Sequence, residues 1–421
     1  MPGPLSFPLK PHIASVGTSA TLEINERCQA LIRDGRKVIR FGFGQSPFPV
    51  PAAVIETLRA HAHEKAYLPV KGLPELRTAA AAFLSKTRQI DVEADQILIG
   101  PGSKELIYLL QVCLQGTLYL PTPSWVSYAP QSVMTGNACR WIRCSPEDHW
   151  KLTPDALDQA VTAPGFLILN YPNNPSGMVY TDQELEALAA VAREKQLIVI
   201  ADEIYNMLRF DGQVTSLAAY YPEGTIITSG LSKWCGAGGW RLGVAAFPRD
   251  ASELLEQMAI LASETFTAVN APLQFAAVTA YADTHDLADY RTRSRQVLSH
   301  IARYVHGQLT SCGVGCIPAG GGFYVFPDMS GHAETLRHRG ILTSDALCMQ
   351  LLEETGVAFL PGTVFGCPPE VLTARLAFVD FDGEHALLDP PDMDTDESWI
   401  EHHTPDIVTG LAKFCTWLAE D

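Results

Sequence analysis

The sequence predicts an α/β protein. Its large domain has a mainly parallel sheet covered by helices on both faces, and its smaller domain is α+β. Short apolar runs of strand length recur along the chain, and helical stretches such as 104–114 and 182–194 lie between them. Strands that alternate with helices are typical of parallel sheets, which bind ligands at the carboxyl ends of their strands. We expect strands at 97–100, 117–120, 166–169, 197–201, 226–229 and 243–247.

A long predicted helix at 286–309 leaves the large domain. An N-terminal arm, a helix over 21–34 and a short strand over 38–44 are expected to join the small domain. The stretch 382–405 is acidic and contains adjacent prolines, so we expect a solvated loop. The other expected elements are strands at 322–327 and 374–379 and helices at 343–355 and 406–419. The predicted domains are 1–50 (arm and part of the small domain), 51–300 (large domain) and 301–421 (small domain).

Charge and cysteine usage limit the possible partners. The chain has 421 residues and a formal net charge of −17, and no run of Lys and Arg interrupts this acidity. Such a surface repels nucleic acid and anionic membranes, so we expect neither as a partner.

The ten cysteines form no CxxC pair, which favours reduced thiols in a cytoplasmic protein over disulfides or zinc. No apolar run is long enough to span a membrane.

The most informative stretch is 229–243, where Lys233 and Arg241 stand among glycines that let backbone approach a ligand closely. A lysine in a tight, dry site has a lowered pKa and can attack a carbonyl, while an arginine suits a phosphate. An aldehyde-bearing phosphate cofactor needs both groups. Taken alone, the stretch fits a mobile surface loop with two solvated cations equally well.

Several polar or aromatic residues directly follow predicted strands, where a parallel sheet binds its ligands. Asp202 is the strongest signal, because a carboxylate at the end of a buried strand is costly without a cation or metal. Gly102-Ser103-Lys104 precedes a helix and can form an anion site, or its serine can simply cap that helix. Trp125 can stack on a flat ligand or belong to the core, and Asn174 can bind a ligand or shape a turn.

Together these motifs resemble the class I/II aminotransferases of the aspartate aminotransferase family, which are fold type I pyridoxal-phosphate enzymes. The resemblance covers about residues 15–381, with the motifs in the family's order. It implies pyridoxal 5'-phosphate as cofactor, and transfer of an amino group from an L-amino acid to a 2-oxo acid by a ping-pong mechanism through pyridoxamine phosphate. It also implies a homodimer with active sites at the subunit interface.

The resemblance also implies roles for individual residues. Lys233 is the Schiff-base lysine and the acid/base of the proton shift, and Asp202 pairs with the pyridine nitrogen and keeps it charged. Tyr205 and Asn174 share the phenolic oxygen of the cofactor. The other cofactor-binding residues are Gly102, Ser103 and Lys104 (mainly through backbone N–H groups), Trp125, Arg241 and, from the neighbouring subunit, Tyr67. The α-carboxylate of the substrate is bound by Arg375, Asn174 and the backbone of Gly44.

Two departures from the family pattern concern the ligands. Gly230 stands where some relatives carry a serine that touches the phosphate, so one phosphate hydrogen bond is in doubt. Some relatives selective for acidic amino acids carry a lysine shortly before a Ser-Ala-Thr run, whereas Gly17 and Thr18 precede Ser19-Ala20-Thr21 here. This difference weakens a dicarboxylate assignment, with 2-oxoglutarate still open as the acceptor.

Two other functions compete with transamination. A pyridoxal-phosphate lyase or synthase that acts on C–S bonds or by β-elimination has the same fold and nearly the same motifs. A non-enzymatic regulator built on this fold would need an attached DNA-binding module, and the chain contains no basic helix for one.

Overall fold

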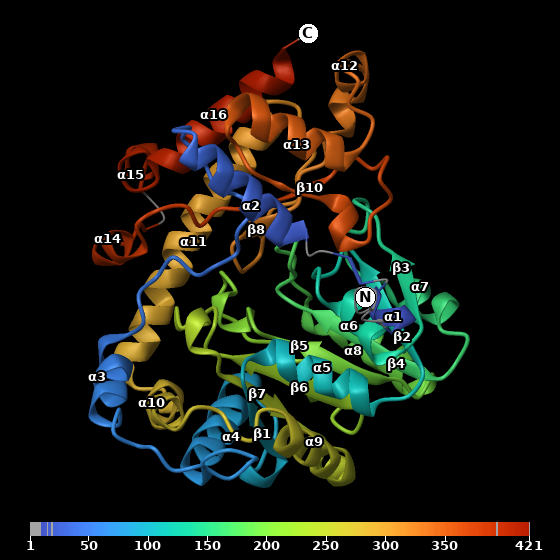
Figure 1. Ribbon diagram of the computed structural model, residues 1–421, viewed down its shortest axis with the longest axis vertical. Coiled ribbons are helices and arrows are strands. Elements are labelled where there is room, and N and C mark those ends of the chain that lie inside the picture. The colour runs from blue at the N-terminus through green and yellow to red at the C-terminus, as the bar shows by residue number, and fades with distance from the viewer. Residues whose placement is uncertain (1–9, 15, 18–19, 393–394, 421) are drawn as a thin grey trace, which may run out of the picture.

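The computed structural model describes residues 10–14, 16–17, 20–392 and 395–420. Its centre is a seven-stranded sheet in the order β1-β7-β6-β5-β4-β2-β3 (Figure 1). The strands are β1 (Ile97–Gly100), β2 (Thr117–Thr122), β3 (Cys139–Arg143), β4 (Gly165–Asn170), β5 (Ile198–Asp202), β6 (Thr225–Gly230) and β7 (Gly243–Ala246). Neighbouring strands are parallel except at β7, which is antiparallel to β1 and β6. The predicted mainly parallel α/β sheet is therefore confirmed.

Helices cover both faces of this sheet. They are α4 (Pro74–Arg88), α5 (Ser103–Cys113), α6 (Tyr128–Thr135), α7 (Pro154–Ala160), α8 (Asp182–Glu194), α9 (Ser252–Thr265) and α10 (Ala271–Tyr281). The helix α3 (Ala52–Ala60) packs on the outside, against α10. Successive residues of a strand point to opposite faces. In β5, Ile200 packs in one cluster with Leu106 of α5 and Met258 of α9, whereas Val199 packs in another with Leu185 of α8. Burial on both faces explains why these strands are apolar throughout.

A second, antiparallel sheet has the order β8-β10-β9. Its strands are β8 (Tyr324–Val325), β9 (Leu360–Pro361) and β10 (Ala374–Ala377). The helices outside the large sheet are α1 (Pro11–Ala14), α2 (Ala20–Arg33), α11 (His285–Ser311), α12 (Ala333–His338), α13 (Ser344–Thr355), α14 (Gly383–Leu388), α15 (Glu397–His403) and α16 (Pro405–Ala419). Ile24 and Leu31 of α2 pack with Phe326 and Leu360, so this N-terminal helix belongs with the small sheet.

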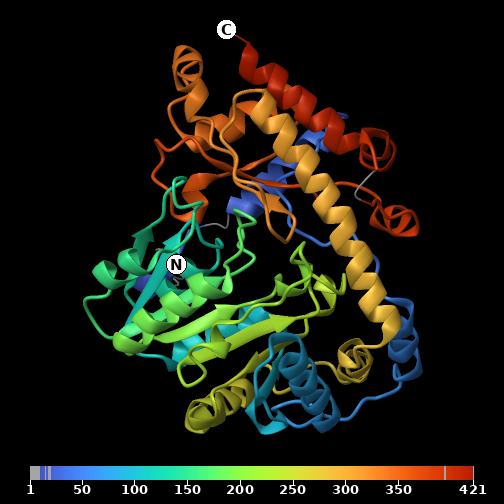
Figure 2. The same cartoon turned by 180° about the vertical axis from the view of Figure 1, so that it is seen from behind.

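The helix α11 connects the two parts of the molecule. It is 27 residues long, and Figure 2 shows it in golden yellow along the back, from the large sheet to the small one. We propose that the chain divides into the arm, large domain and small domain expected above. In this division α11 is the joint, since it runs through residue 300.

Most expected elements begin and end within two residues of their predicted bounds, but two predictions are wrong. The segment 38–44 is not a strand. Only Ile39 forms a bridge, with Val357, and the chain then turns back so that the Phe43 N–H donates to the Arg40 carbonyl. The edge strand β3 was not predicted at all.

The acidic stretch 382–405 is not a solvated loop. Within its described part it forms α14 and α15, whose residues Ala386, Trp399 and Ile400 are buried in the main core cluster. Two of its acidic residues are helix caps: Asp382 accepts from the His385 N–H and Asp396 from the Ser398 N–H. In the described residues, no helix combines the length and the apolar character that crossing a membrane requires.

Candidate active site

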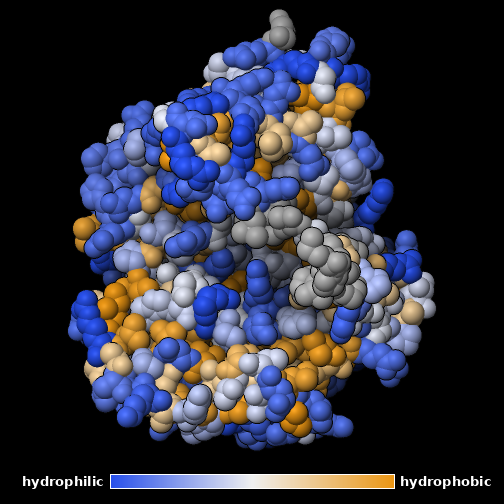
Figure 3. Space-filling model, in the orientation of Figure 1, coloured by the Kyte–Doolittle hydropathy of each residue, from blue (hydrophilic) through white to orange (hydrophobic). Residues whose placement is uncertain are grey.

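A cavity of about 750 Å³ lies at the carboxyl ends of β4, β5 and β6, where the small sheet faces the large one. Figure 3 shows the molecule hollowed between its upper part, which carries the small sheet, and its lower part. The cavity is where the sequence places the site, because parallel strands leave their loops at this edge. The predicted site residues that line it are Gly44, Ser103, Lys104, Trp125, Asn174, Asp202, Tyr205, Lys233, Arg241 and Arg375.

Lys233 follows β6 and reaches across the cavity. Its Nζ donates to the Gly44 carbonyl at 2.9 Å and lies 5.5 Å from the ring centre of Tyr205. Burial, reinforced by the charge of Arg375, lowers the pKa of this amine to about 8, although Asp202 opposes the shift. At pH 7 roughly a tenth of the amine is therefore neutral and can act as a base or nucleophile.

Asp202 is the last residue of β5 and is only 2% exposed. Its hydrogen-bond donors are neutral: Tyr128 Oη at 2.6 Å and the Ile204 N–H at 3.3 Å. Burial raises the pKa of this carboxyl to about 6, and the hydrogen bonds limit that rise. A buried carboxylate whose direct donors are neutral suits a ligand that brings a positive group. Tyr128 was missed by sequence reasoning.

Arg375, on β10, is 4% exposed. Its Nη1 donates to Asn174 Oδ1 at 3.0 Å and its Nη2 to the Gly42 carbonyl at 2.6 Å. The guanidinium lies over the ring of Tyr324 at 4.7 Å, and its Nε is buried without a partner in the described structure. Burial lowers the pKa of Arg375. A dry arginine with spare donors is suited to a carboxylate.

A second candidate anion site is the start of α5. No side chain caps this helix, so the N–H groups of its first turn are left to donate hydrogen bonds to an anion. Gly102 precedes it with φ +92°, and a Cβ there would lie 2.2 Å from Arg241 Nη2. A Cβ on Gly243 would lie 2.5 Å from the Ser103 nitrogen. Glycine at both positions therefore lets Arg241 and the helix start approach one another, as a phosphate site requires.

Lys104 points its side chain into the cavity, which sequence reasoning did not predict. Its Nζ lies 4.9 Å from the ring centre of Trp125. Burial and the nearby charge of Arg241 lower the pKa of Lys104. Lys104 is thus a fourth cation in the cavity, besides Lys233, Arg241 and Arg375.

Tyr324 is a further residue that sequence reasoning missed. Its hydroxyl is 2.9 Å from the Tyr205 hydroxyl and donates to the Gly44 carbonyl at 3.4 Å. A Cβ on Gly44 would lie 1.8 Å from this hydroxyl, so only glycine fits there. Burial raises the pKa of Tyr205, and Tyr324 adds to that rise. The run of glycines before Tyr324 was the available signal, since it lets this segment approach the large sheet.

Three positions named from the sequence lie apart from the cavity lining: Gly102, which directly precedes the lining residue Ser103, Tyr67 and Gly230. Tyr67 is 90% exposed and points to no site in its own chain. Gly230 ends β6, and a Cβ there would lie 2.6 Å from the Leu242 carbonyl oxygen. A serine at 230 would therefore force the backbone apart, which accounts for the missing hydroxyl.

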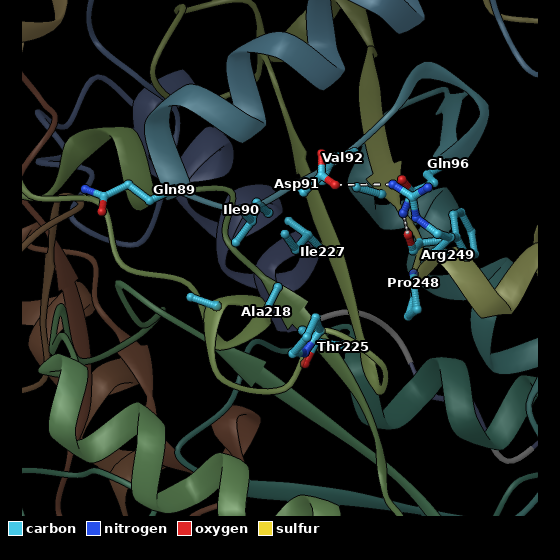
Figure 4. Close-up of a pocket in the computed structure, with 14 residues that line it drawn as sticks. Gln89, Ile90, Asp91, Val92, Gln96, Ala218, Thr225, Ile227, Pro248 and Arg249 are labelled. Carbon is cyan, nitrogen blue, oxygen red and sulfur yellow. Dashed lines mark hydrogen bonds and ion pairs between the residues drawn. The ribbon is translucent and has the colours of Figure 1, made fainter.

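A second cavity, of about 360 Å³, lies on another part of the large sheet and is lined by Gln89, Thr225 and Arg249, among others (Figure 4). Arg249 Nη2 donates to Asp91 Oδ2 at 3.2 Å on its rim. None of the predicted site residues lines it. We assign it no part in the reaction.

The lysine, the buried acid and the anion sites suit amine or carbonyl chemistry on an anionic molecule, and comparisons with known proteins identify the class. The family model described as aminotransferase class I and II matches residues 36–379. Aspartate aminotransferase of Geobacillus stearothermophilus is 33% identical over 88% of this chain and 95% of its own. Asparagine–oxo-acid transaminase of Streptococcus mutans is 30% identical over 86% of this chain and 93% of its own. The structure of Thermus thermophilus aspartate aminotransferase with maleate superposes with a TM-score of 0.84 at 26% identity, covering 98% of this chain and all of that one.

The chain belongs to the class I and II aminotransferases. It is an enzyme that transfers an amino group, of a family that depends on pyridoxal phosphate. The names of its relatives do not favour the lyase alternative.

Proposed function

We propose that this cavity binds pyridoxal 5'-phosphate and transfers an amino group between an L-amino acid and a 2-oxo acid. The observation that carries the proposal is the position of Lys233, an amine of lowered pKa in the same cavity as the buried acid Asp202 and the arginine Arg375. The test is a panel of L-amino acids followed by the cofactor's absorbance. Conversion by an amino acid, reversed by a 2-oxo acid, supports transfer. Release of ammonia with no acceptor present would contradict it.

The residues fit this cofactor. The start of α5 and Arg241 offer a cradle for a phosphate, in which Gly102 leaves room that a Cβ would fill. Asp202, whose direct donors are neutral, suits the protonated nitrogen of the ring. Trp125 lines the cavity and offers a flat face for stacking. When bound, the cofactor supplies an electron sink that stabilises the carbanion left by loss of the α-proton.

The protein's own groups then have defined tasks. Lys233 holds and moves the proton at the substrate's α-carbon, and its lowered pKa suits that exchange near neutral pH. Arg375 binds the α-carboxylate through donors kept free of a charged partner, and so fixes which bond at the α-carbon is broken. Tyr205, held by the Tyr324 hydroxyl, offers its own hydroxyl to a ligand oxygen.

A dicarboxylic amino acid such as aspartate is the donor we propose. With Arg241 assigned to the phosphate, Arg375 to the α-carboxylate and Lys233 to the proton, Lys104 is the one cation of the described lining without a task. A second substrate carboxylate would pair with it. The names of the relatives, several of them aspartate aminotransferases, support this choice. The sequence lacks the lysine that some relatives selective for acidic amino acids carry before a Ser-Ala-Thr run, and this difference weakens the dicarboxylate assignment. Its position relative to the cavity is not known, because Thr18 and Ser19 lie outside the described residues.

Replacing Lys104 by glutamine tests this assignment. The Lys104→Gln variant keeps the backbone N–H at the start of α5 but loses the charge over Trp125. We expect kcat/KM for aspartate to fall roughly 10- to 100-fold, the value of a charge-assisted hydrogen bond, and that for alanine to change less than about threefold. Lys151→Gln, on the surface near Glu184, is the matched control. Equal losses for the two substrates would refute the assignment.

Tyr324 is proposed as a positioning residue for Tyr205. In Tyr324→Phe the ring stays against Arg375, but the hydrogen bond between the two hydroxyls is lost. We expect kcat to fall about 5- to 10-fold with little change in KM, and the pH midpoint of the cofactor's absorbance to shift. Tyr290→Phe removes a comparable hydroxyl bond, to the Pro49 carbonyl, outside the cavity. If the two variants behave alike, Tyr324 has only a structural role.

We also propose that the enzyme acts as a homodimer. Tyr67 is 90% exposed in the single chain, which is unusual for a large aromatic side chain and fits a residue that completes a partner's site. Apolar side chains also gather on the lower part of the face in Figure 3. The molar mass in solution, measured by light scattering, tests this, and a monomer at working concentration would refute it. A cytoplasmic location stays a proposal, to be tested by cell fractionation.

A further inference from the structure

One pair of cysteines stands out. All ten cysteines are free thiols, and the sulfurs of Cys312 and Cys415 are 2.6 Å apart. This is closer than two unbonded sulfur atoms normally pack, and about half an ångström longer than a disulfide bond. Within the described residues, no other pair of cysteine sulfurs is joined by a hydrogen bond.

The pair joins two helices that already pack together. Cys312 directly follows α11, and Cys415 lies in α16. Leu309 of α11 and Leu411 of α16 are both fully or almost fully buried in the main core cluster. The two sulfurs would have to approach by only about half an ångström to bond. Both thiols are half-buried, so a small oxidant can reach them.

The two thiols have unequal roles. The Cys415 thiol donates a hydrogen bond to the Cys312 sulfur, which lowers the pKa of Cys312 and raises that of Cys415. Cys312 is therefore the better nucleophile of the two. Cys316, four residues later, is a poor competitor because burial raises the pKa of its thiol to about 12.

We propose that Cys312 and Cys415 form a reversible disulfide on exposure to a hydroperoxide. The Cys312 thiolate attacks one peroxide oxygen, breaks the O–O bond and becomes a sulfenic acid while hydroxide leaves. Cys415 then attacks this sulfur, the S–S bond forms and water leaves. Two thiols lose two protons and two electrons, and hydrogen peroxide is reduced to two molecules of water. A dithiol reductant reverses the reaction by thiol–disulfide exchange.

The cross-link would enclose the small sheet. The two cysteines are 103 residues apart, and β8, β9 and β10 lie between them. Closing a loop of this length restricts the unfolded chain strongly. Since the sulfurs already touch, we expect the oxidised holoenzyme to keep its activity within about twofold and to melt about 5 °C higher than the reduced form.

The test uses the holoenzyme treated with hydrogen peroxide, followed by thiol counting and peptide mass spectrometry. We expect the loss of two of the ten thiols and a peptide pair linked through Cys312 and Cys415, both reversed by dithiothreitol. Cys415→Ser should abolish the cross-linked pair, and Cys316→Ser should retain it. The proposal is overturned if no linked pair is found, if Cys312 is oxidised while Cys415 stays a thiol, or if Cys415→Ser loses the same two thiols. Peptide mapping of the wild-type protein requires no variant to fold.

Discussion

Replacing Lys233 by alanine is expected to lower kcat/KM for the best amino-acid donor by at least about 10⁴-fold. Among the described residues, Lys233 is the one amine that combines a lowered pKa with a hydrogen bond to the Gly44 carbonyl at 2.9 Å, and the variant loses it. Removing a group with the two roles proposed for Lys233, nucleophile and proton carrier, gives losses of this size or larger. Steady-state kinetics of the purified variant measure the effect.

The same lysine gives a second, independent readout. Only the neutral amine reacts with an aldehyde, and a pKa of about 8 makes the neutral form about tenfold more abundant at pH 9 than at pH 7. The uptake of pyridoxal phosphate by the wild-type apoprotein should therefore speed up about tenfold over that interval.

Lys195→Ala, which removes a surface partner of Asp158, is the control and should keep full activity. A Lys233→Ala protein that is folded by circular dichroism and keeps more than a tenth of wild-type activity would refute the account of the site.

The largest effect on stability is expected from Arg88→Met. The Arg88 Nε donates to Glu203 Oε2 at 2.5 Å, and both side chains are 0% exposed. Glu203 also accepts hydrogen bonds from Tyr171, Ser216 and Asn206 in this dry interior. Among the described residues, Arg88 is the one cation paired with Glu203, so its removal leaves a buried acidic side chain without a charged partner. We expect a loss of about 3–5 kcal/mol in the free energy of unfolding, measured by urea denaturation.

Two further variants separate this buried pair from ordinary surface charges. Arg88→Met combined with Glu203→Gln removes both charges and should regain part of the lost stability. Arg293→Gln breaks an exposed pair with Asp289 one turn away on α11 and should cost less than about 0.5 kcal/mol. If Arg88→Met costs no more than Arg293→Gln, the buried pair does not stabilise the fold.

Local sequence was enough for six of the seven strands of the large sheet and for polar residues at the carboxyl ends of two of them. Asp202 and Lys233 each follow an apolar run, and a parallel sheet brings such ends together whatever the length of the chain between them. Tyr128 and Tyr324 escaped prediction for the opposite reason. They contact Asp202 and Tyr205 across 74 and 119 residues. Nothing in the local sequence distinguishes Tyr128 from a core tyrosine, and the glycines before Tyr324 do not by themselves indicate which residue its hydroxyl contacts.

The wrong predictions also have physical causes. In 382–405 the many acidic residues make the composition look like that of a solvated loop. The stretch also contains a few large apolar side chains, such as Trp399 and Ile400, whose burial packs α15 against the core. In 38–44 Ile39 and Phe41 are buried, but their backbone hydrogen bonds go to separate partners. Ile39 pairs with the segment after α13, and the Phe41 carbonyl accepts from Ala377 of β10. Burial without a continuous ladder does not make a strand.

The location of Arg375 has a consequence for how such an enzyme diversifies. It stands on β10 of the small sheet, whereas Asp202 and Lys233 follow strands of the large one. In the site proposed above, the arginine that binds the α-carboxylate and the groups that move the proton therefore belong to separate sheets that meet at the cavity. Substitutions that remodel the small sheet can change how Arg375 holds the α-carboxylate while the strands that carry Asp202 and Lys233 stay as they are.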